Sequence, residues 1–296
     1  MNHPRSAFGA SLSRGRHLWP GTAGSTVSLE GRAAGSATTR LCMRADQLLV
    51  ARGLAASRSQ AQRLIASGAR WQRAGQWQAM AKSDDIPADA LVEIIDSAES
   101  RYVSRGGLKL EGALHSSGVD PTGAWCLDVG QSTGGFTDCL LQHGAAHVVG
   151  VDVGHGQLHA RLRSDPRVTC LEKVNARELS APDLIAHCAV LARAGGQFDL
   201  IVGDLSFISL TLVLPALAPL LKPGAVLLML VKPQFELQPA QIGKGGIVKD
   251  AALYAEVEQR IRVCCATLGL DVTGWYASAI TGGDGNHEFF VHAARH

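Results

Sequence analysis

Four ionisable residues could act together: Lys109, Asp204, Lys232 and Glu288. Lys109 precedes the predicted sheet and Glu288 opens its last strand. Asp204 and Lys232 directly follow two apolar runs of strand length, and side chains at the carboxyl ends of neighbouring strands meet at one edge of a sheet. A lysine accepts a proton only if its pKa falls, which burial or a nearby cation promotes. Together the four residues could orient and deprotonate a weak nucleophile. Singly, each could equally be a surface charge or half of a salt bridge.

A glycine-rich turn follows the first predicted strand. Residues 125–129 are apolar apart from Asp128, which is typical of a strand buried on both faces. Gly130 ends this strand, and Gly134 and Gly135 allow a tight turn into a helix. The spacing Asp-x-Gly-x-x-x-Gly differs from the Gly-x-Gly-x-x-Gly of dinucleotide sites. It resembles motif I of the class I S-adenosylmethionine (SAM) methyltransferases, although a turn without a ligand has the same glycines.

A second acid stands at the distance that a nucleoside site requires. Residues 146–151 predict the next strand, and Asp152 ends it, about 20 residues after the first glycine, where an acid hydrogen-bonds ribose hydroxyls. Asn175 follows a third strand, where it could contact the adenine edge or serve only as a turn residue. The predicted cofactor-binding residues are Asp128, Gly130, Ser132, Thr133, Gly134, Gly135, Phe136, Asp152, Asn175 and Asp204.

Strands and helices alternate through most of the chain. The predicted strands are 125–129, 146–151, 167–171, 198–203, 225–231, 272–280 and 288–292, and the predicted helices include 108–117, 210–221 with two prolines, and 251–268. Residues 238–250 are rich in glycine and lysine and predict a mobile loop over the site. This alternation predicts an α/β fold with a doubly wound sheet and a ligand at the carboxyl ends of its strands.

Five short motifs surround the four ionisable residues. They are 104–110 (SRGGLKL), 128–138 (DVGQSTGGFTD), 203–208 (GDLSFI), 231–236 (VKPQFE) and 285–289 (GNHEF). The order Lys, Asp, Lys, Glu resembles the tetrad of the FtsJ-like ribose 2′-O-methyltransferases, and the motifs together are similar to the TlyA (haemolysin A) family. Gln131 replaces the usual alanine and His287 an apolar residue, and neither departure touches the tetrad.

The resemblance implies a Rossmann-like class I SAM-dependent methyltransferase with a seven-stranded, mostly parallel sheet. It implies methyl transfer from SAM to the ribose 2′-OH of a nucleotide, with cytidine in ribosomal RNA as the substrate and ribosomal subunits as partners. Lys232 is the candidate for orienting and deprotonating the hydroxyl. Lys109 is the nearby cation that promotes this deprotonation, and Asp204 and Glu288 orient the lysines and the hydroxyl. No metal is required. The alternatives are methylation at another RNA position and, as the older family name suggests, a cytolysin.

A small basic segment precedes the α/β region. Residues 43–98 contain six arginines and Lys82 against a single acid before Asp84, which is typical of a phosphate-binding surface. Leucines at helical spacing and Ser57 as an N-cap predict two helices. The segment resembles the S4-type RNA-binding domain, an α+β fold, except after Gly68, where the hairpin sequence departs from the family pattern. The predicted RNA-binding residues are Arg44, Arg58, Arg63 and Arg70; a solvated basic face is the alternative.

The remaining segments suggest a domain division. Residues 1–42 have no periodicity and one acid, so we expect a disordered extension; a start at Met43 is favoured over a transit peptide. Residues 99–107 read as an interdomain linker, and 108–296 as the methyltransferase domain.

The bulk composition excludes several classes of protein. The net charge of +2 over 296 residues suits one large and one small domain, and no apolar run is long enough to span a bilayer. Seven scattered cysteines fit a reducing cytoplasm. Histidine pairs at i,i+4 have glycines between them, so they do not predict a metal site.

Overall fold

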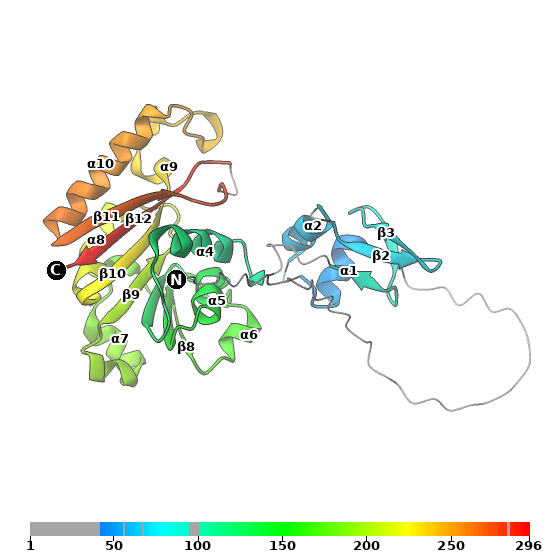
Figure 1. Ribbon diagram of the computed structural model, residues 1–296, viewed down its shortest axis with the longest axis horizontal. Coiled ribbons are helices and arrows are strands. Elements are labelled where there is room, and N and C mark those ends of the chain that lie inside the picture. Colours follow the sequence, from blue (N-terminus) through cyan, green and yellow to red (C-terminus); the bar gives the residue numbers. More distant parts are fainter. Residues whose placement is uncertain (1–41, 56, 67, 95–100, 283–284) are drawn as a thin grey trace, which may run out of the picture.

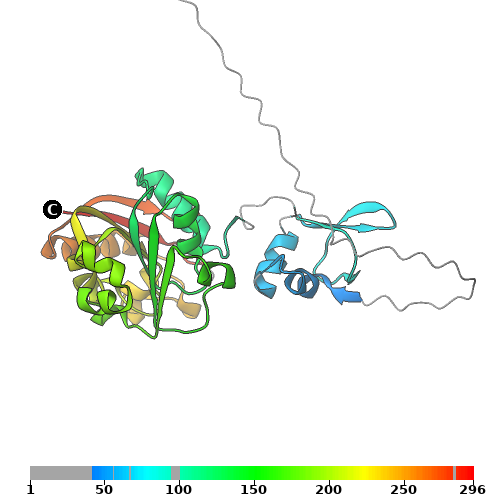
Figure 2. The same ribbon diagram turned by 90° about the horizontal axis from the view of Figure 1, so that it is seen from below.

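The computed structural model describes residues 42–55, 57–66, 68–94, 101–282 and 285–296 (Figures 1 and 2). The predicted extension therefore lies outside the described residues, except for Cys42. The elements of the N-terminal unit are β1 (Cys42–Arg44), α1 (Ala45–Ala51), α2 (Arg58–Ala66), β2 (Arg70–Arg73), β3 (Gln76–Ala79), β4 (Asp85–Pro87) and β5 (Val92–Glu93).

The N-terminal unit packs its two helices over a small apolar core. Leu48, Leu49 and Leu64 from the helices are almost fully buried together with Ile86 of β4. Ser57 caps α2 as predicted, since its Oγ accepts a hydrogen bond from the backbone N–H of Gln60 at 3.2 Å. The two helices that the leucine spacing predicts are thus present.

The hairpin that departs from the S4 pattern nevertheless forms. β2 and β3 pair antiparallel, with Arg73 opposite Gln76, so that only Ala74 and Gly75 connect them. Both connecting residues have positive φ, 48° and 81°. Two positive φ angles are the geometry of a type I′ turn, which matches the twist of the strands it joins.

The second unit contains the remaining elements. They are α4 (Gly106–Ser117), β6 (Trp125–Val129), α5 (Gly135–Gln142), β7 (His147–Asp152), α6 (Ala160–Arg163), β8 (Val168–Glu172), η1 (Ala176–Glu178), α7 (Ala181–His187), η2 (Ala189–Ala194), β9 (Phe198–Gly203), η3 (Leu210–Leu212), α8 (Leu214–Leu217), η4 (Ala218–Leu220), β10 (Leu221–Val231), α9 (Pro233–Glu236), η5 (Pro239–Gln241), η6 (Lys244–Gly246), α10 (Ala252–Thr267), β11 (Leu270–Ala277) and β12 (Phe289–Arg295), where η denotes a 3₁₀ helix.

These strands form one seven-stranded sheet in the order β11-β12-β10-β9-β6-β7-β8. The five strands from β10 to β8 are parallel, and β12 runs antiparallel to both β10 and β11. The chain winds outward from β6 in one direction through β7 and β8, and in the other through β9 and β10. The predicted doubly wound, mostly parallel sheet is confirmed, with its topological switch point between β6 and β9.

Helices cover both faces of the sheet (Figures 1 and 2). One buried cluster joins the sheet to α4, α5 and α6, and another joins it to α7, α8 and α10. The predicted helix 210–221 is instead three short helices, because Pro215 and Pro219 each lie in the first turn of a new helix. Proline has no N–H for a preceding turn, so it is tolerated in the first turn of a helix and interrupts a longer one.

The ends of the last three strands differ from the prediction. β10 begins at Leu221, four residues early, because Leu221 pairs with Phe198 across an irregularity before Val226. β11 ends at Ala277 and β12 begins at Phe289, so Glu288 precedes the last strand by one residue.

The helix predicted from Leu108 begins at Gly106, inside the predicted linker. A Cβ on Gly107 would lie 2.2 Å from the Tyr102 ring, and Tyr102 is buried in the core beneath α4 and α5. Residues 102–107 are therefore packed as part of the second unit, whereas 95–100 lie outside the described residues.

Candidate active site

The site lies at the switch point, where β6 and β9 end side by side. The backbone N–H of Asp204, just beyond β9, donates to the carbonyl of Val129 at 3.1 Å. A Cβ at Gly130 would stand 2.7 Å from the carbonyl oxygen of Asp204. Gly130 is required here because the turn after β6 lies directly against the backbone that carries Asp204, and because its φ is 84°.

All four predicted catalytic residues converge at this point. Lys109 Nζ lies 2.6 Å from Glu288 Oε2 and 3.6 Å from Asp204 Oδ2. Lys232 Nζ lies 2.6 Å from Asp204 Oδ1. Asp204 thus bridges the two lysines, and the four residues form one continuous ion-pair network built from α4, the ends of β9 and β10, and the residue before β12.

The network is sheltered but not sealed. The side chains of Lys109, Lys232 and Glu288 are 10%, 11% and 3% exposed, and that of Asp204 is 23% exposed. Two positive and two negative charges balance, which reduces the cost of burying any one of them. Lys232 also donates to Ser206 Oγ at 2.8 Å. Ser206 is exposed, so Lys232 is the lysine of the network that contacts an exposed residue.

A cavity joins this network to the glycine-rich turn. Its lining includes Gly130, Ser132, Thr133 and Gly135 from the turn together with Asp204 and Lys232. Ser132 and Gly134 have positive φ, 47° and 94°. A Cβ on Gly135 would come within 2.2 Å of Ser104 Oγ, so only glycine fits where the chain enters α5. These residues form a backbone-lined cradle beside a lysine, which suits a ligand whose reactive group must face Lys232.

Asp152 ends β7 beside the cradle, as predicted. Its Oδ2 accepts from the backbone N–H of Ser132 and its Oδ1 from that of Gly154, both at 2.7 Å. Carboxylate oxygens retain further lone pairs, so Asp152 can fix the turn and still accept from a ribose hydroxyl. The next residue, Val153, is an apolar side chain that is 71% exposed. An exposed valine directly after the strand-end acid offers a surface for a flat ring, and sequence reasoning missed it.

Asp128 occupies a different place from the other predicted cofactor residues. Its carboxylate is 1% exposed and accepts from Thr137 Oγ1 at 2.7 Å, and Thr137 in turn accepts from Gln131 Nε2 at 2.9 Å. Burial raises the pKa of Asp128 to about 7. Asp128 therefore ties the turn to α5 from beneath, and it does not line the cavity.

Gln131, which departs from the family pattern, is matched by a glycine on the adjacent strand. A Cβ on Gly150 would stand 2.0 Å from the Gln131 side chain. The buried Gln131 amide thus occupies the space that a larger residue at position 150 would fill, and its departure from alanine does not disturb the turn.

The side chain of Asn175 bonds within the turn that follows β8. Its side chain caps η1, accepting from the backbone N–H of Arg177 at 3.2 Å and donating to Glu178 Oε1 at 3.0 Å. Each amide atom makes one bond within the turn and keeps a second N–H or a further lone pair, so a contact with the adenine edge stays a prediction beside the turn role.

Two aromatic residues beside the tetrad were missed by sequence reasoning. Phe207, three residues after Asp204, is 91% exposed and has a φ of 63°. Its ring lies 5.2 Å from that of Phe235, three residues after Lys232. A bulky residue at positive φ that exposes an aromatic ring is uncommon and marks a functional position. The spacing of each phenylalanine from a tetrad residue is the signal that could have revealed the pair.

Glu236 connects the segment after Asp204 to the segment after Lys232. Its buried carboxylate accepts from Ser209 Oγ at 2.5 Å and from the backbone N–H of Leu210 at 2.7 Å. The segment after Asp204 is thereby fixed to the segment after Lys232. Glu236 therefore fixes the segments that follow Asp204 and Lys232 relative to each other. It does not line the cavity.

The loop predicted to be mobile is anchored. Asn286, which is 2% exposed, accepts from the backbone N–H of Val248 and donates to the carbonyl of Gly246, both at 2.9 Å. Residues 238–250 are thus fastened to the segment that leads into Glu288.

The predicted RNA-binding arginines have partners within the N-terminal unit. Arg44 and Arg58 pair with the buried Asp46, and Arg70 pairs with Glu93. The hydrogen bond from Gln62, with those from Arg58 and Arg44, lowers the pKa of Asp46 to about 2. The side chains of Arg44 and Arg58 remain about half exposed, at 47% and 56%. The side chain of Arg63 lies outside the described residues.

Two further expectations concern absences. Within the described residues there is no cluster of three or more side chains that could hold a metal ion, and no helix is long and apolar enough to cross a membrane.

Comparison with known proteins agrees with this geometry. The model of the FtsJ-like methyltransferase family matches residues 102–295. The 16S/23S rRNA (cytidine-2′-O)-methyltransferase TlyA of Mycobacterium tuberculosis is 44% identical over 248 residues, 84% of this chain and 88% of the relative. Two solved structures carry the hemolysin name. That from Streptococcus thermophilus is 37% identical, covers 87% of this chain and 90% of that one, and has a TM-score of 0.65. That from Lactococcus lactis is 41% identical, with coverages of 66% and 89% and a TM-score of 0.61. The chain belongs to the FtsJ-like methyltransferase family and, within it, to the TlyA (haemolysin A) group.

Proposed function

We propose that this protein transfers the methyl group of SAM to the ribose 2′-OH of a cytidine in ribosomal RNA. The observation that carries the proposal is the network of Lys109, Asp204, Lys232 and Glu288 beside the glycine-rich cradle. Relatives named as rRNA cytidine-2′-O-methyltransferases support the substrate class.

The cradle residues have separate tasks in holding the cofactor. SAM supplies an electrophilic methyl group on a sulfonium. The turn from Gly130 to Gly135 offers backbone groups at close range, Asp152 accepts from ribose hydroxyls, and Val153 gives the adenine an apolar surface. We assign Asp128 to supporting the turn rather than to a direct contact, while Asn175 caps η1 and remains a candidate for the adenine edge.

Lys232 orients the 2′-OH and removes its proton. Bound SAM would supply the methyl group and take up the electrons of its carbon–sulfur bond. As the ribose oxygen is methylated, its proton would pass to Lys232 Nζ and then to solvent. Asp204 positions Lys232 through their ion pair, and Lys109, which shares Asp204 and pairs with Glu288, completes the network. Most of the rate should come from alignment of the reactants, where effective molarity is large.

The RNA is held at two places. Phe207 and Phe235 form an exposed aromatic pair next to the tetrad, and such rings stack on unpaired bases. The target cytidine is therefore stacked on Phe207 while its ribose faces Lys232. The S4-like unit contributes Arg44, Arg58, Arg63 and Arg70 to RNA phosphates, since ion pairing with Asp46 leaves Arg44 and Arg58 half exposed.

Mapping of 2′-O-methyl groups tests the proposal. Ribosomal RNA from cells with and without the gene, and the same RNA treated with purified protein and SAM, should differ at specific cytidine riboses. Methylation on a base would instead support the alternative RNA reaction. Absence of any methyl transfer to rRNA or ribosomal subunits, from a protein that binds SAM, would contradict the proposal.

A further inference from the structure

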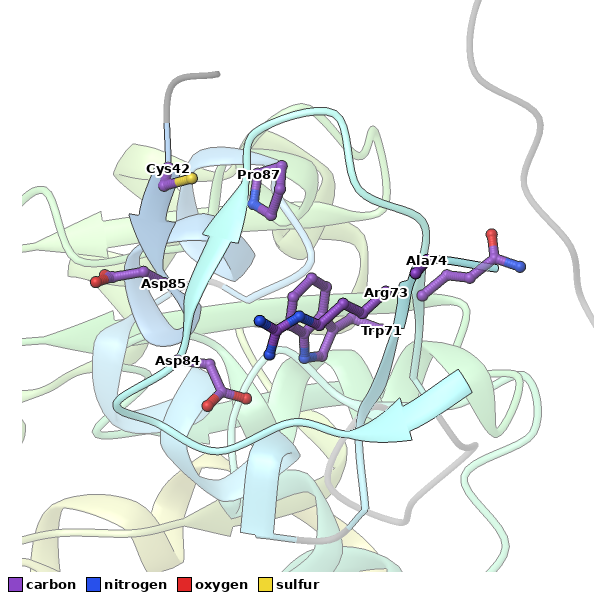
Figure 3. Close-up of a pocket in the computed structure, with 8 residues that line it drawn as sticks. Cys42, Trp71, Arg73, Ala74, Asp84, Asp85 and Pro87 are labelled. Carbon is purple, nitrogen blue, oxygen red and sulfur yellow. The ribbon is translucent and has the colours of Figure 1, made fainter. Parts of the chain in front are cut away.

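A hollow of about 310 Å³ lies on the N-terminal unit and is lined only by residues of that unit (Figure 3). Its walls come from β1, β2 and β4 and the segment before β4, and include Trp71, Arg73 and Asp84. Trp71 and Arg73 belong to the hairpin whose sequence departs from the S4 pattern. The size falls in the range of small-molecule sites.

Trp71 contributes an unused hydrogen-bond donor to this hollow. Its side chain is only 5% exposed, and its Nε1–H is buried without a hydrogen-bond partner. Buried donors in native proteins nearly always have a partner, because leaving one unpaired costs free energy. The unpaired N–H lies at the wall of the hollow but is shielded from solvent, so a bound group would use this donor only after displacing the atoms that cover it.

Two charged groups face the same space. Arg73 is exposed and forms no ion pair with any described residue. Asp84 Oδ2 accepts from the backbone N–H of Ala81 at 2.8 Å, which fixes the carboxylate and leaves Oδ1 as an acceptor. Figure 3 shows the guanidinium of Arg73 and the indole nitrogen of Trp71 on the side toward Asp84, whereas the Asp85 carboxylate points away.

We infer that this hollow binds an unpaired guanine base of the RNA substrate. The inference rests on the proposed function for the presence of RNA. Asp84 stands in the lining beside Arg73, and a carboxylate at this place disfavours a phosphate and favours a neutral group that offers both acceptors and donors. Guanine displays O6 and N7 acceptors, which an arginine reads in pairs, beside the N1–H and N2–H donors that a carboxylate accepts. Arg73 and Trp71 donate to the acceptor edge, and Asp84 Oδ1 accepts from the donor edge.

The indole N–H of Trp71 reports binding directly by two-dimensional ¹H–¹⁵N NMR of the full chain. Titration with GMP should shift the Trp71 resonance, which is identified by its absence in Trp71→Phe, whereas CMP, AMP and UMP should shift it less. Trp71→Phe keeps an aromatic ring and removes the N–H. Losing one hydrogen bond should weaken GMP binding roughly threefold to tenfold. In Trp71→Phe, which lacks the indole resonance, this affinity is followed by the backbone amide shifts of the hairpin. Trp77→Phe, in the same hairpin, is the matched control and should bind GMP as the wild type does.

Asp84→Asn tests the specificity. The asparagine oxygen can still accept from Ala81, so the turn is kept, but the free acceptor becomes a donor. GMP binding should fall while binding of the other nucleotides is retained. Three outcomes overturn the inference. The Trp71 resonance does not shift with millimolar GMP; it shifts equally with all four nucleotides or with inorganic phosphate; or it shifts with an arginine-rich peptide and with no nucleotide.

The two proposals fail separately. If the wild type methylates rRNA but GMP leaves Trp71 unmoved, the hollow is not a guanine site. If GMP binds but no methyl group reaches rRNA, the proposed function is wrong while the nucleotide site stands.

Discussion

At the scale of single residues, the tetrad and the glycine-rich turn were predictable, and the buried bonds behind them were not. Asp204 and Lys232 directly follow apolar runs, so the topology of a parallel sheet places them together. Asp128 stands one residue before the end of its strand, and it faces into the protein and bonds Thr137, nine residues away. Which face a strand-end side chain occupies depends on packing that local pattern does not encode.

The buried carboxyl of Asp128 should make stability depend on pH. Its pKa is about 7 in the folded protein, chiefly through burial, against about 3.9 in an unfolded chain. The unfolded state alone ionises between these values, so the free energy of unfolding should fall as pH rises from about 4 to about 7, by up to roughly 4 kcal/mol.

Asp128→Asn should remove most of this pH dependence and raise stability near pH 8, as measured by urea unfolding across pH. Asp120→Asn, at an exposed carboxyl whose pKa a hydrogen bond from Thr122 lowers, is the matched control and should not raise stability. A wild-type stability that is flat over this pH range would show that Asp128 is already ionised in the folded protein.

Asp152→Ala should weaken SAM binding while the fold is kept. Losing a charge-assisted hydrogen bond costs roughly 1.5–3 kcal/mol, or about tenfold to a hundredfold in affinity. Calorimetric titration with SAM measures the change. Glu172→Ala removes the acid at the end of the neighbouring strand β8 and should leave the affinity unchanged. Equal affinities for wild type and Asp152→Ala would exclude Asp152 as the ribose ligand.

At the scale of elements, β6, β7, β8 and β9 were predicted within one residue, whereas the start of β10, the ends of β11, the end of β12 and the irregular elements were not. The three short helices that replace 210–221 follow from proline positions whose effect depends on tertiary packing. Likewise, the basic character of the α1–α2 segment was evident, but the pairing of Arg44 and Arg58 with Asp46 was not, because it joins residues from two helices and a strand.

This pairing shapes the test of the basic surface. Arg58→Ala with Arg63→Ala should weaken rRNA binding across sequences and flatten its salt dependence by about one slope unit per lost phosphate contact. SAM affinity should not change. Because Arg58 also pairs with Asp46, the thermal unfolding of the variant must be measured as well as its RNA binding. Arg70→Ala, which removes an arginine whose partner is Glu93, is the comparison variant. If RNA affinity and its salt slope both survive, the basic face is only solvated.

At the scale of the whole molecule, the α/β alternation predicted the sheet, its order of winding and the place of the site. The boundaries between domains were harder to predict from the sequence. The predicted linker overlaps α4 and includes the buried Tyr102, because burial of a single aromatic ring does not alter local composition. Removal of residues 1–41 should leave methyl transfer and the unfolding temperature unchanged, because this part of the sequence has no helical or strand periodicity. A marked loss of either would assign a role to the extension.

The central claim, that Lys232 accepts the ribose proton, is tested most directly by comparing Lys232→Ala with Lys232→Arg. Both should bind SAM and rRNA, and both should lose turnover by about a hundredfold to ten-thousandfold, the usual contribution of a general base. Arginine should not rescue, because a guanidinium stays protonated and cannot accept the proton. Wild-type turnover should rise with pH, since only a neutral amine takes a proton. Near-normal turnover of Lys232→Arg with the wild-type pH profile would contradict the account and leave Lys232 as a fixed positive charge.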